Sequence, residues 1–429
     1  MTAIRPNIWK LLAPLLAFGA TLAVLVAMHG GDAPAPAPSA GVVDLGPPTG
    51  STDDLVRDMQ RAVRAKPGDA SAYAGLGDAY LQKARETGDP GYYSRAERAY
   101  DAGLRRNPRE VNAVLGAGTL AGLRHDFREA ERLGRQAHRL EPALVGPYAV
   151  LADAEIELGR YGDAARSIQR LLDLRPSLVA YARASYYREL HGDLPGAVAA
   201  MRLAVSAGGS PEGLAYVQAL LGDLELQRGR TGAAALAYRT ALEGIPSYPP
   251  ALVGLARIDA TDGRLDRSAA RLRRAADRLP LTSTLTLLGE VERAAGRREA
   301  ASDDLGAARA QRRLYRAART VPDAEAVLFE ANHGSPAAAV RMGRQVWREA
   351  PSIRSADALG WALTRAARPA EGLTWARRAV RIGSLDPLFR YHAGIAARRS
   401  GHPREAARDL GIARRGAALL PPTAMEAMR

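Results

Sequence analysis

Prolines recur at a fixed interval along this chain. Two runs keep a spacing of 34 residues: Pro108, Pro142 and Pro176, then Pro246 and Pro280. A period of this length is typical of solenoids built from helical pairs, in which each pair packs only on its neighbours. Such a stack has no single cavity where catalytic groups must converge. The period therefore favours a surface that binds partners over an enzyme active site.

Small residues recur at constant offsets between these prolines. Gly118 and Ala130 are one such pair, placed where the two helices of a unit are expected to cross. Small side chains there let the two backbones approach, and larger neighbours fill the groove beside them. Proline ends the second helix because it cannot donate the backbone hydrogen bond and clashes with the preceding turn. Each interval therefore reads as helix, turn, helix and turn.

The unit that begins at Val145 shows the pattern most fully. Its characteristic positions are Tyr148, Leu151, Ala152, Gly159, Tyr161, Ala164, Leu171 and Pro176. These offsets resemble those of the tetratricopeptide repeat family. Ten units can be placed, starting near Ala70, Val111, Val145, Leu178, Ala215, Pro249, Thr282, Thr320, Ile353 and Pro387. The resemblance implies an all-α, right-handed superhelix of about ten helical pairs over residues 53–416.

The array has irregular places and two ends. Residues 53–66 carry apolar side chains at helical spacing and predict a lone helix that covers the first unit. The first unit holds seven extra residues, which we expect the turn at residues 88–91 to absorb. Four extra residues near 311–322 predict either a longer second helix or a bend. The tail, residues 417–429, is too short for a full capping helix.

The N-terminus carries a membrane signal. Residues 11–28 contain no charge and follow Arg5 and Lys10, so residues 1–31 predict an anchor with the repeats outside a bacterial-type cytoplasmic membrane. A cleaved signal followed by secretion is the alternative. Residues 32–52 are rich in proline, alanine and glycine and predict an extended linker.

Charge and cysteine content narrow the chemistry. The chain has no cysteine, which excludes disulfides and thiolate metal sites. The net charge is +14, and 14 arginines against six acids put +8 of it within residues 351–429. The C-terminal units could therefore dock on anionic lipid or a wall polymer, which is one alternative function. The other explanation is an ordinary solvated basic face.

In tetratricopeptide repeat proteins the first helix of each unit forms the inner, concave face, where peptides bind. Carried over by offset, the inward positions of the first half are Asp78, Asp153, Glu157, Tyr186, Glu189, Tyr216 and Asp223. Those of the second half are Arg257, Arg293, Trp361, Arg365, Tyr391, Arg398 and Arg399. The resemblance thus implies a trough that changes sign along its length and orients an extended protein or peptide ligand. The alternative is that these are ordinary solvated helix residues.

Signals for catalysis, metals and cofactors are weak. His125, His191, His333 and His402 fall in turns, and we expect no metal ligands among the histidines. His138 and His392 are expected on helices with no acid or histidine arranged to complete a metal site. No nucleophile elbow, phosphate-binding loop or zinc-protease sequence occurs. We expect no cofactor and no enzyme activity. RNA binding by the repeats is a second alternative, disfavoured by the expected topology, and the oligomeric state is left open.

Overall fold

The structure, a computed structural model, describes residues 51–428. The expected membrane segment and most of the linker lie outside these residues. The described residues belong to one compact unit. Within the described part, this unit contains 22 α-helices, one short 3-10 helix and no strand. None of the described helices is long and apolar enough to cross a lipid bilayer.

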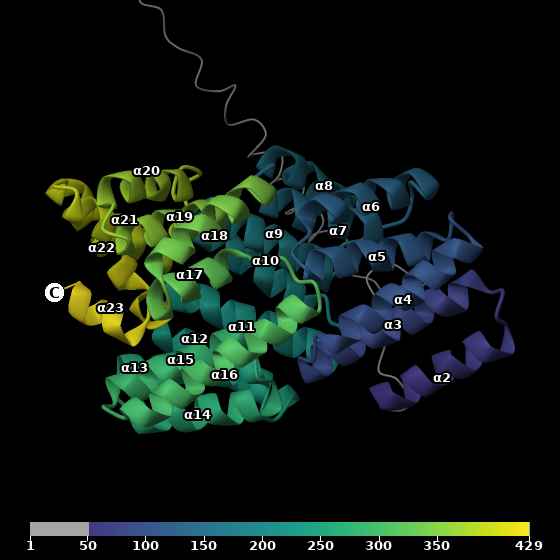
Figure 1. Cartoon of the computed structure of the whole chain (residues 1–429), viewed down its shortest axis with the longest axis horizontal. Helices are drawn as coiled ribbons and strands as arrows, with labels where there is room; N and C mark the ends of the chain where they lie inside the picture. The colour runs from purple at the N-terminus through teal and green to yellow at the C-terminus, as the bar shows by residue number, and fades with distance from the viewer. Residues whose placement is uncertain (1–50, 429) are drawn as a thin grey trace, which may run out of the picture. The chain divides into compact units, whose positions relative to one another are not determined.

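The helices alternate between two sets (Figure 1). The first helices of the ten units are α3 (Ala70–Thr87), α5 (Val111–Leu123), α7 (Gly146–Glu157), α9 (Leu178–Leu190), α11 (Pro211–Gln227), α13 (Pro249–Thr261), α15 (Thr282–Ala294), α17 (Ala324–His333), α19 (Ile353–Arg365) and α21 (Pro387–Arg399). The second helices are α4 (Gly91–Arg106), α6 (Phe127–Leu140), α8 (Tyr161–Leu174), α10 (Leu194–Ser206), α12 (Thr231–Gly244), α14 (Leu265–Arg278), α16 (Arg298–Ala317), α18 (Pro336–Glu349), α20 (Pro369–Ala379) and α22 (Pro403–Arg415).

Three further elements lie at the ends of the array. Helix α2 (Thr52–Ala65) precedes the first pair and packs on α3, as the apolar spacing predicted. After α22 come the 3-10 helix η1 (Ala417–Leu419) and the short helix α23 (Pro422–Ala427). The ten units and the leading helix predicted from the sequence are therefore present.

Local chemistry fixes where helices begin and turn. Ser51 and Asp54 form a reciprocal capping box at the start of α2, and the Ser177 hydroxyl accepts the amide of Ala180 at the start of α9. The turn after α7 contains Gly159 with φ of 70°, a left-handed conformation that glycine adopts without strain. The chain can then reverse direction within three residues.

Each pair is held by small residues against large ones. Ala164 on α8 is completely buried. Tyr100 and Tyr238 are also completely buried, and each ring fits between glycines of two successive first helices: Gly77 and Gly116 for Tyr100, Gly222 and Gly254 for Tyr238. A side chain on any of these glycines would overlap the tyrosine ring. The repeated small residues are therefore packing sites, as predicted.

Buried acids pair with arginines near several of the turns. Asp259, which is 3% exposed, contacts Arg264 and Arg271, and Glu292, which is 0% exposed, contacts Arg273 and Arg297. Paired charges of this kind fix geometry, because loss of one partner leaves the other buried and uncompensated. We therefore assign these four arginines a role in stabilising the folded chain.

The extra residues of the first unit lie in its helices. The turn between α3 and α4 keeps three residues, Gly88–Pro90, while α3 has 18 residues against 13 in α5 and α4 has 16 against 14 in α6. The prediction that the turn absorbs them is therefore wrong. Near residues 311–322, α16 extends to 20 residues, which is the longer second helix.

The superhelix closes on itself. The turns inside the first four units lie against segments that precede the first helices of later units, and the turn inside the fifth unit lies against the end of α22. The amide of Val321 donates to the carbonyl of Arg124 at 2.8 Å, and the amide of Ile353 donates to the Tyr161 hydroxyl, 192 residues away, at 2.9 Å. Arg128 donates to the carbonyl of Arg348 at 2.8 Å.

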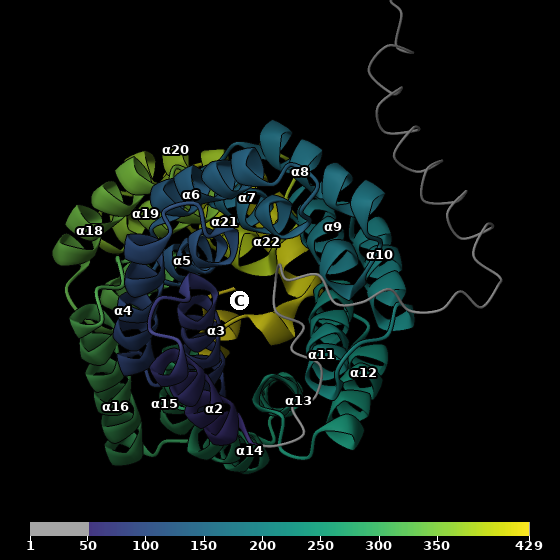
Figure 2. The ribbon, with the colours of Figure 1, turned by 90° about the vertical axis from the view of Figure 1, so that its right-hand side faces the viewer.

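Glycines allow the closest of these approaches. A side chain on Gly159 would overlap the Pro351 carbonyl, and one on Gly192 would overlap the Gly383 carbonyl. Figure 2 shows the result within the compact unit, where the first helices form an inner ring and the second helices an outer one. The inner face is therefore formed by successive superhelical turns whose edges are in contact. It is not one open trough.

Candidate binding surface on the inner face

We define the inner face as the side of the first helices, α3 to α21, that is turned away from the second helices (Figure 2). The charged residues singled out from the sequence all belong to these first helices. Closure of the superhelix brings residues of the first and second halves together on this face. The surface is therefore described by its neighbourhoods and not by position along the chain.

Asp78 and Asp223 are structural partners of the buried tyrosines. The Tyr100 hydroxyl donates to Asp78 at 2.7 Å, and the Tyr238 hydroxyl donates to Asp223 at 2.6 Å. Burial raises the pKa of Asp78 to about 6 and also raises that of Asp223, while the tyrosine hydrogen bonds act in the opposite direction. Each carboxylate therefore accepts a hydrogen bond that joins the two helices of its unit, α3 to α4 and α11 to α12.

Asp153, Arg183 and Tyr216 form a row across α7, α9 and α11. Arg183 donates through Nε and Nη2 to both carboxylate oxygens of Asp153, at 2.9 and 2.7 Å. This fork fixes the orientation of both side chains. Tyr216 lies within range of both charges and keeps 48% of its surface exposed. An exposed tyrosine beside an oriented ion pair has the composition of a protein-binding hot spot.

Arg354 joins the two superhelical turns on the inner face. Its Nη1 donates to the Tyr186 hydroxyl at 3.3 Å, and its charge acts on Glu157 and Glu325. The neighbouring Tyr186 and Glu157 hold the pKa of Arg354 well above its usual range, and burial raises the pKa of Tyr186. One arginine thus compensates acidic groups contributed by both halves of the chain.

Glu189 sits beside this cluster. Gln227 donates to its carboxylate at 2.8 Å, while burial and the negative charges of Asp386 and Asp223 raise the pKa of Glu189 to about 7. Burial outweighs the amide hydrogen bond and the more distant charge of Arg354. The inner face therefore gains negative charge as the pH rises through neutrality.

We expect Glu189→Gln to stabilise the protein at pH 8 and to change little at pH 5. Glu189 titrates near pH 7 when folded and near its ordinary value of 4.5 when unfolded, so the folded state holds the proton more tightly. The stability this provides is complete below pH 4.5 and is lost as the pH rises to 7. Glutamine cannot ionise, which should give a gain on the order of 1 kcal/mol at pH 8. Urea unfolding of both proteins at both pH values measures it.

The exposed Glu243→Gln on α12 is the matched control for this change. It should show the same difference from wild type at pH 5 and pH 8. A Glu189→Gln difference that does not depend on pH would contradict the assignment of the shifted pKa to this carboxyl.

The arginines of the second half occupy three different environments. Arg257 on α13 donates to the carbonyl of Leu419 in η1 at 3.2 Å. Arg293 is exposed and lines a surface hollow of about 330 Å³ together with Arg298 and Arg309 on α16. These two arginines therefore have different neighbours in the fold.

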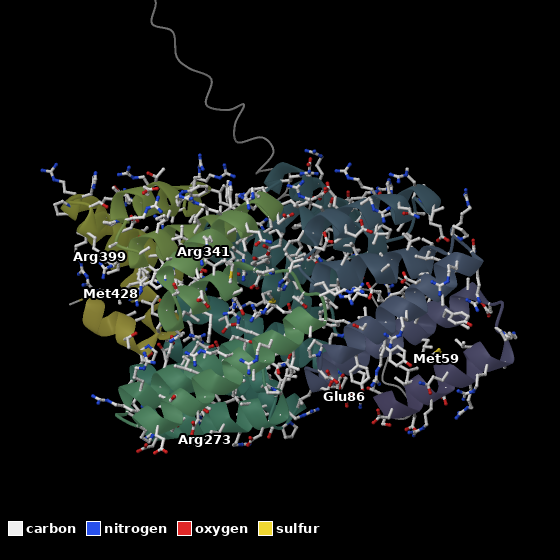
Figure 3. All side chains as sticks on the ribbon, viewed as in Figure 1. Met59, Glu86, Arg273, Arg341, Arg399 and Met428 are labelled. Carbon is white, nitrogen blue, oxygen red and sulfur yellow. The ribbon has the colours of Figure 1, made fainter. Side chains whose placement is uncertain are left out.

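The guanidinium groups of Arg365 and Arg399 make contacts within the protein. Arg365 donates to the Ala331 carbonyl at 3.4 Å and lies 5.9 Å from the Trp361 ring. Arg399 donates to the Thr364 carbonyl at 3.3 Å, and the neighbouring Arg398 is exposed. Figure 3 labels Arg399 at the C-terminal end of the array. The binding role of all these arginines stays a prediction.

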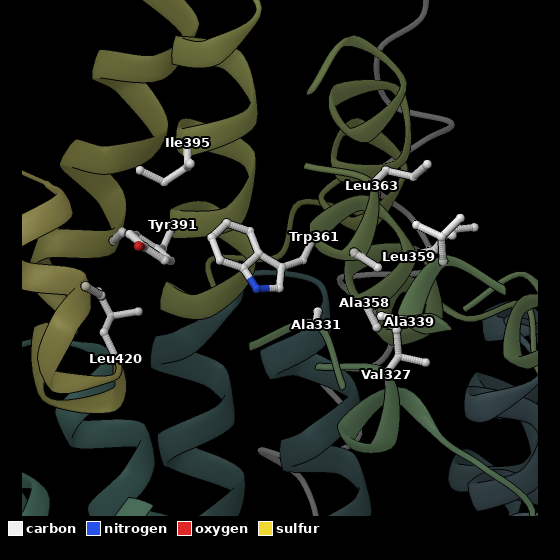
Figure 4. Packing of buried hydrophobic residues seen from close by; sticks show 14 of the residues in the cluster. Val327, Ala331, Ala339, Ala358, Leu359, Trp361, Leu363, Tyr391, Ile395 and Leu420 are labelled. Carbon is white, nitrogen blue, oxygen red and sulfur yellow. The ribbon is translucent and has the colours of Figure 1, made fainter. Parts of the chain in front are cut away.

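Trp361 and Tyr391 belong to the hydrophobic core. They are 5% and 7% exposed and pack with Leu359 and Ile395 (Figure 4). Their expected place on an open surface is wrong, because α19 contacts both α17 and α21. Side chains that point along the ring, from one first helix to the next, are covered by that neighbour.

A buried acid–histidine pair was missed from the sequence. His392 Nδ1 lies 2.9 Å from Asp357, both residues are at most 2% exposed, and the imidazole stacks on Trp361 at 4.2 Å. The signal was the spacing of 35 residues between Asp357 and His392, which puts them on adjacent first helices. Within residues 51–428, no group of three acids or histidines could hold a metal ion.

A comparison with known protein families gives a match for part of the chain. Residues 150–211 match the family model for the tetratricopeptide repeat. No curated protein matches the sequence significantly.

Among solved structures, the chain is similar to PilW, a type IV pilus biogenesis factor, with 19% identity, a TM-score of 0.39, and coverage of 46% of this chain and 90% of that one. It is similar to YrrB, a tetratricopeptide repeat protein with an unusual peptide-binding site, with 19% identity, a TM-score of 0.30, and coverage of 46% and 97%. It is also similar to the human IFIT1 dimer with PPP-AAAA, with 15% identity, a TM-score of 0.46, and coverage of 86% and 78%. Likenesses of this strength transfer no function.

Proposed function

We propose that the chain is a scaffold that binds a protein or peptide on its inner face, and the match of residues 150–211 to the tetratricopeptide repeat model supports this proposal. The observation that supports this most is the row of Asp153, Arg183 and Tyr216, in which an exposed ring stands beside an oriented ion pair. Aromatic and arginine side chains dominate the energy of protein interfaces, and their oriented charges give specificity.

A random peptide library tests this proposal and does not require the partner to be identified. Peptides selected from a display library on the intact chain should bind Tyr216→Ala about tenfold more weakly or worse, because truncation removes the exposed anchor. Asp153→Ala should also weaken binding, since Arg183 would lose its fixed orientation. Fluorescence anisotropy with labelled selected peptides measures both effects.

The control is Leu236→Ala on the outer helix α12, where the leucine is 63% exposed. The selected peptides should bind this variant as they bind the wild type. Peptides that keep full affinity for the two inner-face variants would remove the assignment of binding to this row.

We further propose that residues 11–28 tether the protein to a cytoplasmic membrane and that the repeats lie on its outer side. The uncharged run and the preceding positive charges support this proposal. The chain has no native cysteine, so Ser51→Cys gives a single reporter thiol at the end of the linker. A membrane-impermeant maleimide should label this thiol on intact cells. Labelling only after lysis would contradict the proposed topology.

A further inference from the structure

The C-terminal segment, residues 417–428, returns to the inside of the ring. The 3-10 helix η1 contacts α11, α13 and α21, and α23 contacts α15. All four are first helices, so the segment lies on the inner face. Figure 2 shows the C-terminal end in the middle of the ring of helices.

This segment is bound by its backbone and by apolar side chains. Arg257, a residue chosen from the sequence as a partner contact, donates to the Leu419 carbonyl at 3.2 Å. Ala418 packs into the hydrophobic cluster of α11, α12 and α13. Leu420, Ala424 and Met428 are at most 4% exposed and join the cluster of α17 to α22. Leu420 approaches Tyr391 there (Figure 4).

A segment that only capped the array would cover the last pair, α21 and α22. This one also packs on α11, α13 and α15, which belong to units that precede it by more than 120 residues. Leu420 follows η1 in extended backbone, Ala424 lies in the six-residue helix α23, and Met428 follows that helix. The segment therefore contacts the inner face as a short peptide of mixed backbone conformation with buried apolar side chains.

We propose that residues 417–428 are an intramolecular ligand of the inner face from α11 to α21, and that a partner segment of the same chemistry displaces them. The partner is a short segment of another protein with uncharged apolar side chains at the spacing of Ala418, Leu420, Ala424 and Met428. Its backbone carbonyl replaces that of Leu419 on Arg257. This inference rests on the proposed scaffold function and names the class of ligand for one part of the inner face.

The tail itself is the probe. A fluorescein-labelled peptide of residues 416–429 is titrated into the intact full chain, into the chain ended at Gly416, and into the full chain carrying Leu420→Asp. The last two should bind the peptide at least about tenfold more tightly than the intact chain, because their inner face is vacated while the native tail competes in the wild type. A peptide carrying the same Leu420→Asp change should not bind either one.

Thr423→Asp in the full chain is the matched control, since Thr423 is exposed. It adds the same charge to the same segment without touching its apolar face, and it should bind the peptide as weakly as the wild type. Circular dichroism and hydrogen exchange of α11 and α13 establish that each variant is folded.

Folded variants that bind the peptide no more tightly than the intact chain would overturn the proposal. Loss of fold in both variants would overturn it as well, because the receptor of a displaceable ligand must stay folded after the ligand dissociates. Failure here is distinct from failure of the scaffold function. If the affinity of the library peptides still depends on Tyr216 while the tail peptide does not bind, only the proposed role of the tail is contradicted.

Discussion

Ala164→Arg should unfold the middle of the superhelix. Ala164 lies on α8 at its crossing with α7 and is completely buried. An arginine there must either separate the two helices or leave its guanidinium in the core without a partner. Overpacking and an uncompensated buried charge together should cost about 3–5 kcal/mol. Hydrogen exchange of α7 and α8, followed through a urea titration, measures the loss where it occurs.

Thr231→Arg is the control for this prediction. Thr231 is exposed at the start of α12, where an added arginine reaches solvent. Its effect on unfolding should stay within about 0.5 kcal/mol. If Ala164→Arg unfolded at the same urea concentration as Thr231→Arg, the register of α8 against α7 would be incorrect.

Gly254→Val should loosen the contact between α11, α12 and α13. A side chain at Gly254 would overlap the ring of Tyr238, which is completely buried and donates to Asp223 at 2.6 Å. Moving the ring breaks this hydrogen bond and leaves the half-buried Asp223 carboxylate without its donor. The expected loss is about 2–4 kcal/mol. Local hydrogen exchange of the three helices in increasing urea reports it.

Gly232→Val separates this packing effect from the helix propensity of valine. Gly232 lies within α12, and a side chain built there meets no atom within 4 Å. Both variants make the same change within a helix, so their difference measures the collision with Tyr238. Equal stabilities would contradict the placement of that ring between Gly222 and Gly254.

The helical pairs could be predicted from the sequence because their signals are local and repeated. Each closing proline and each small residue at a crossing acts within its own unit, so errors in one unit do not spread to the next. The burial of Ala164 and the packing of Gly118 on Leu133 follow directly from this periodicity. Even the long helix α16 was signalled by four extra residues.

Closure could not be predicted in this way. It depends on small rotations between units that accumulate over a full superhelical turn. The contacts that close it use backbone groups of turns, such as the Val321 amide on the Arg124 carbonyl, and these groups exist in any sequence. We call the contact between successive superhelical turns the seam. No periodic pattern in the sequence marks the residues that meet across it.

The inner-face prediction was limited by a related cause. Offsets assign a residue to the first helix of its unit but do not say which neighbour covers it. Trp361 and Tyr391 are covered by adjacent first helices, and Asp78 is held by Tyr100. Asp153 and Tyr216 remain exposed. The return of the tail onto Arg257 was equally invisible, because it joins residues 162 positions apart.

Chemical cross-linking tests the closed superhelix most directly. The chain has no cysteine, so Arg128→Cys combined with Arg348→Cys gives two thiols on opposite sides of the seam, where the Arg128 side chain reaches the Arg348 carbonyl at 2.8 Å. A short bis-maleimide should join them within one chain. The pair Arg128→Cys and Arg273→Cys should not be joined, since α6 and α14 lie on opposite sides of the ring (Figure 2). Mass spectrometry that finds both thiols of the seam pair modified separately, with no intramolecular link, would show that the two superhelical turns do not meet.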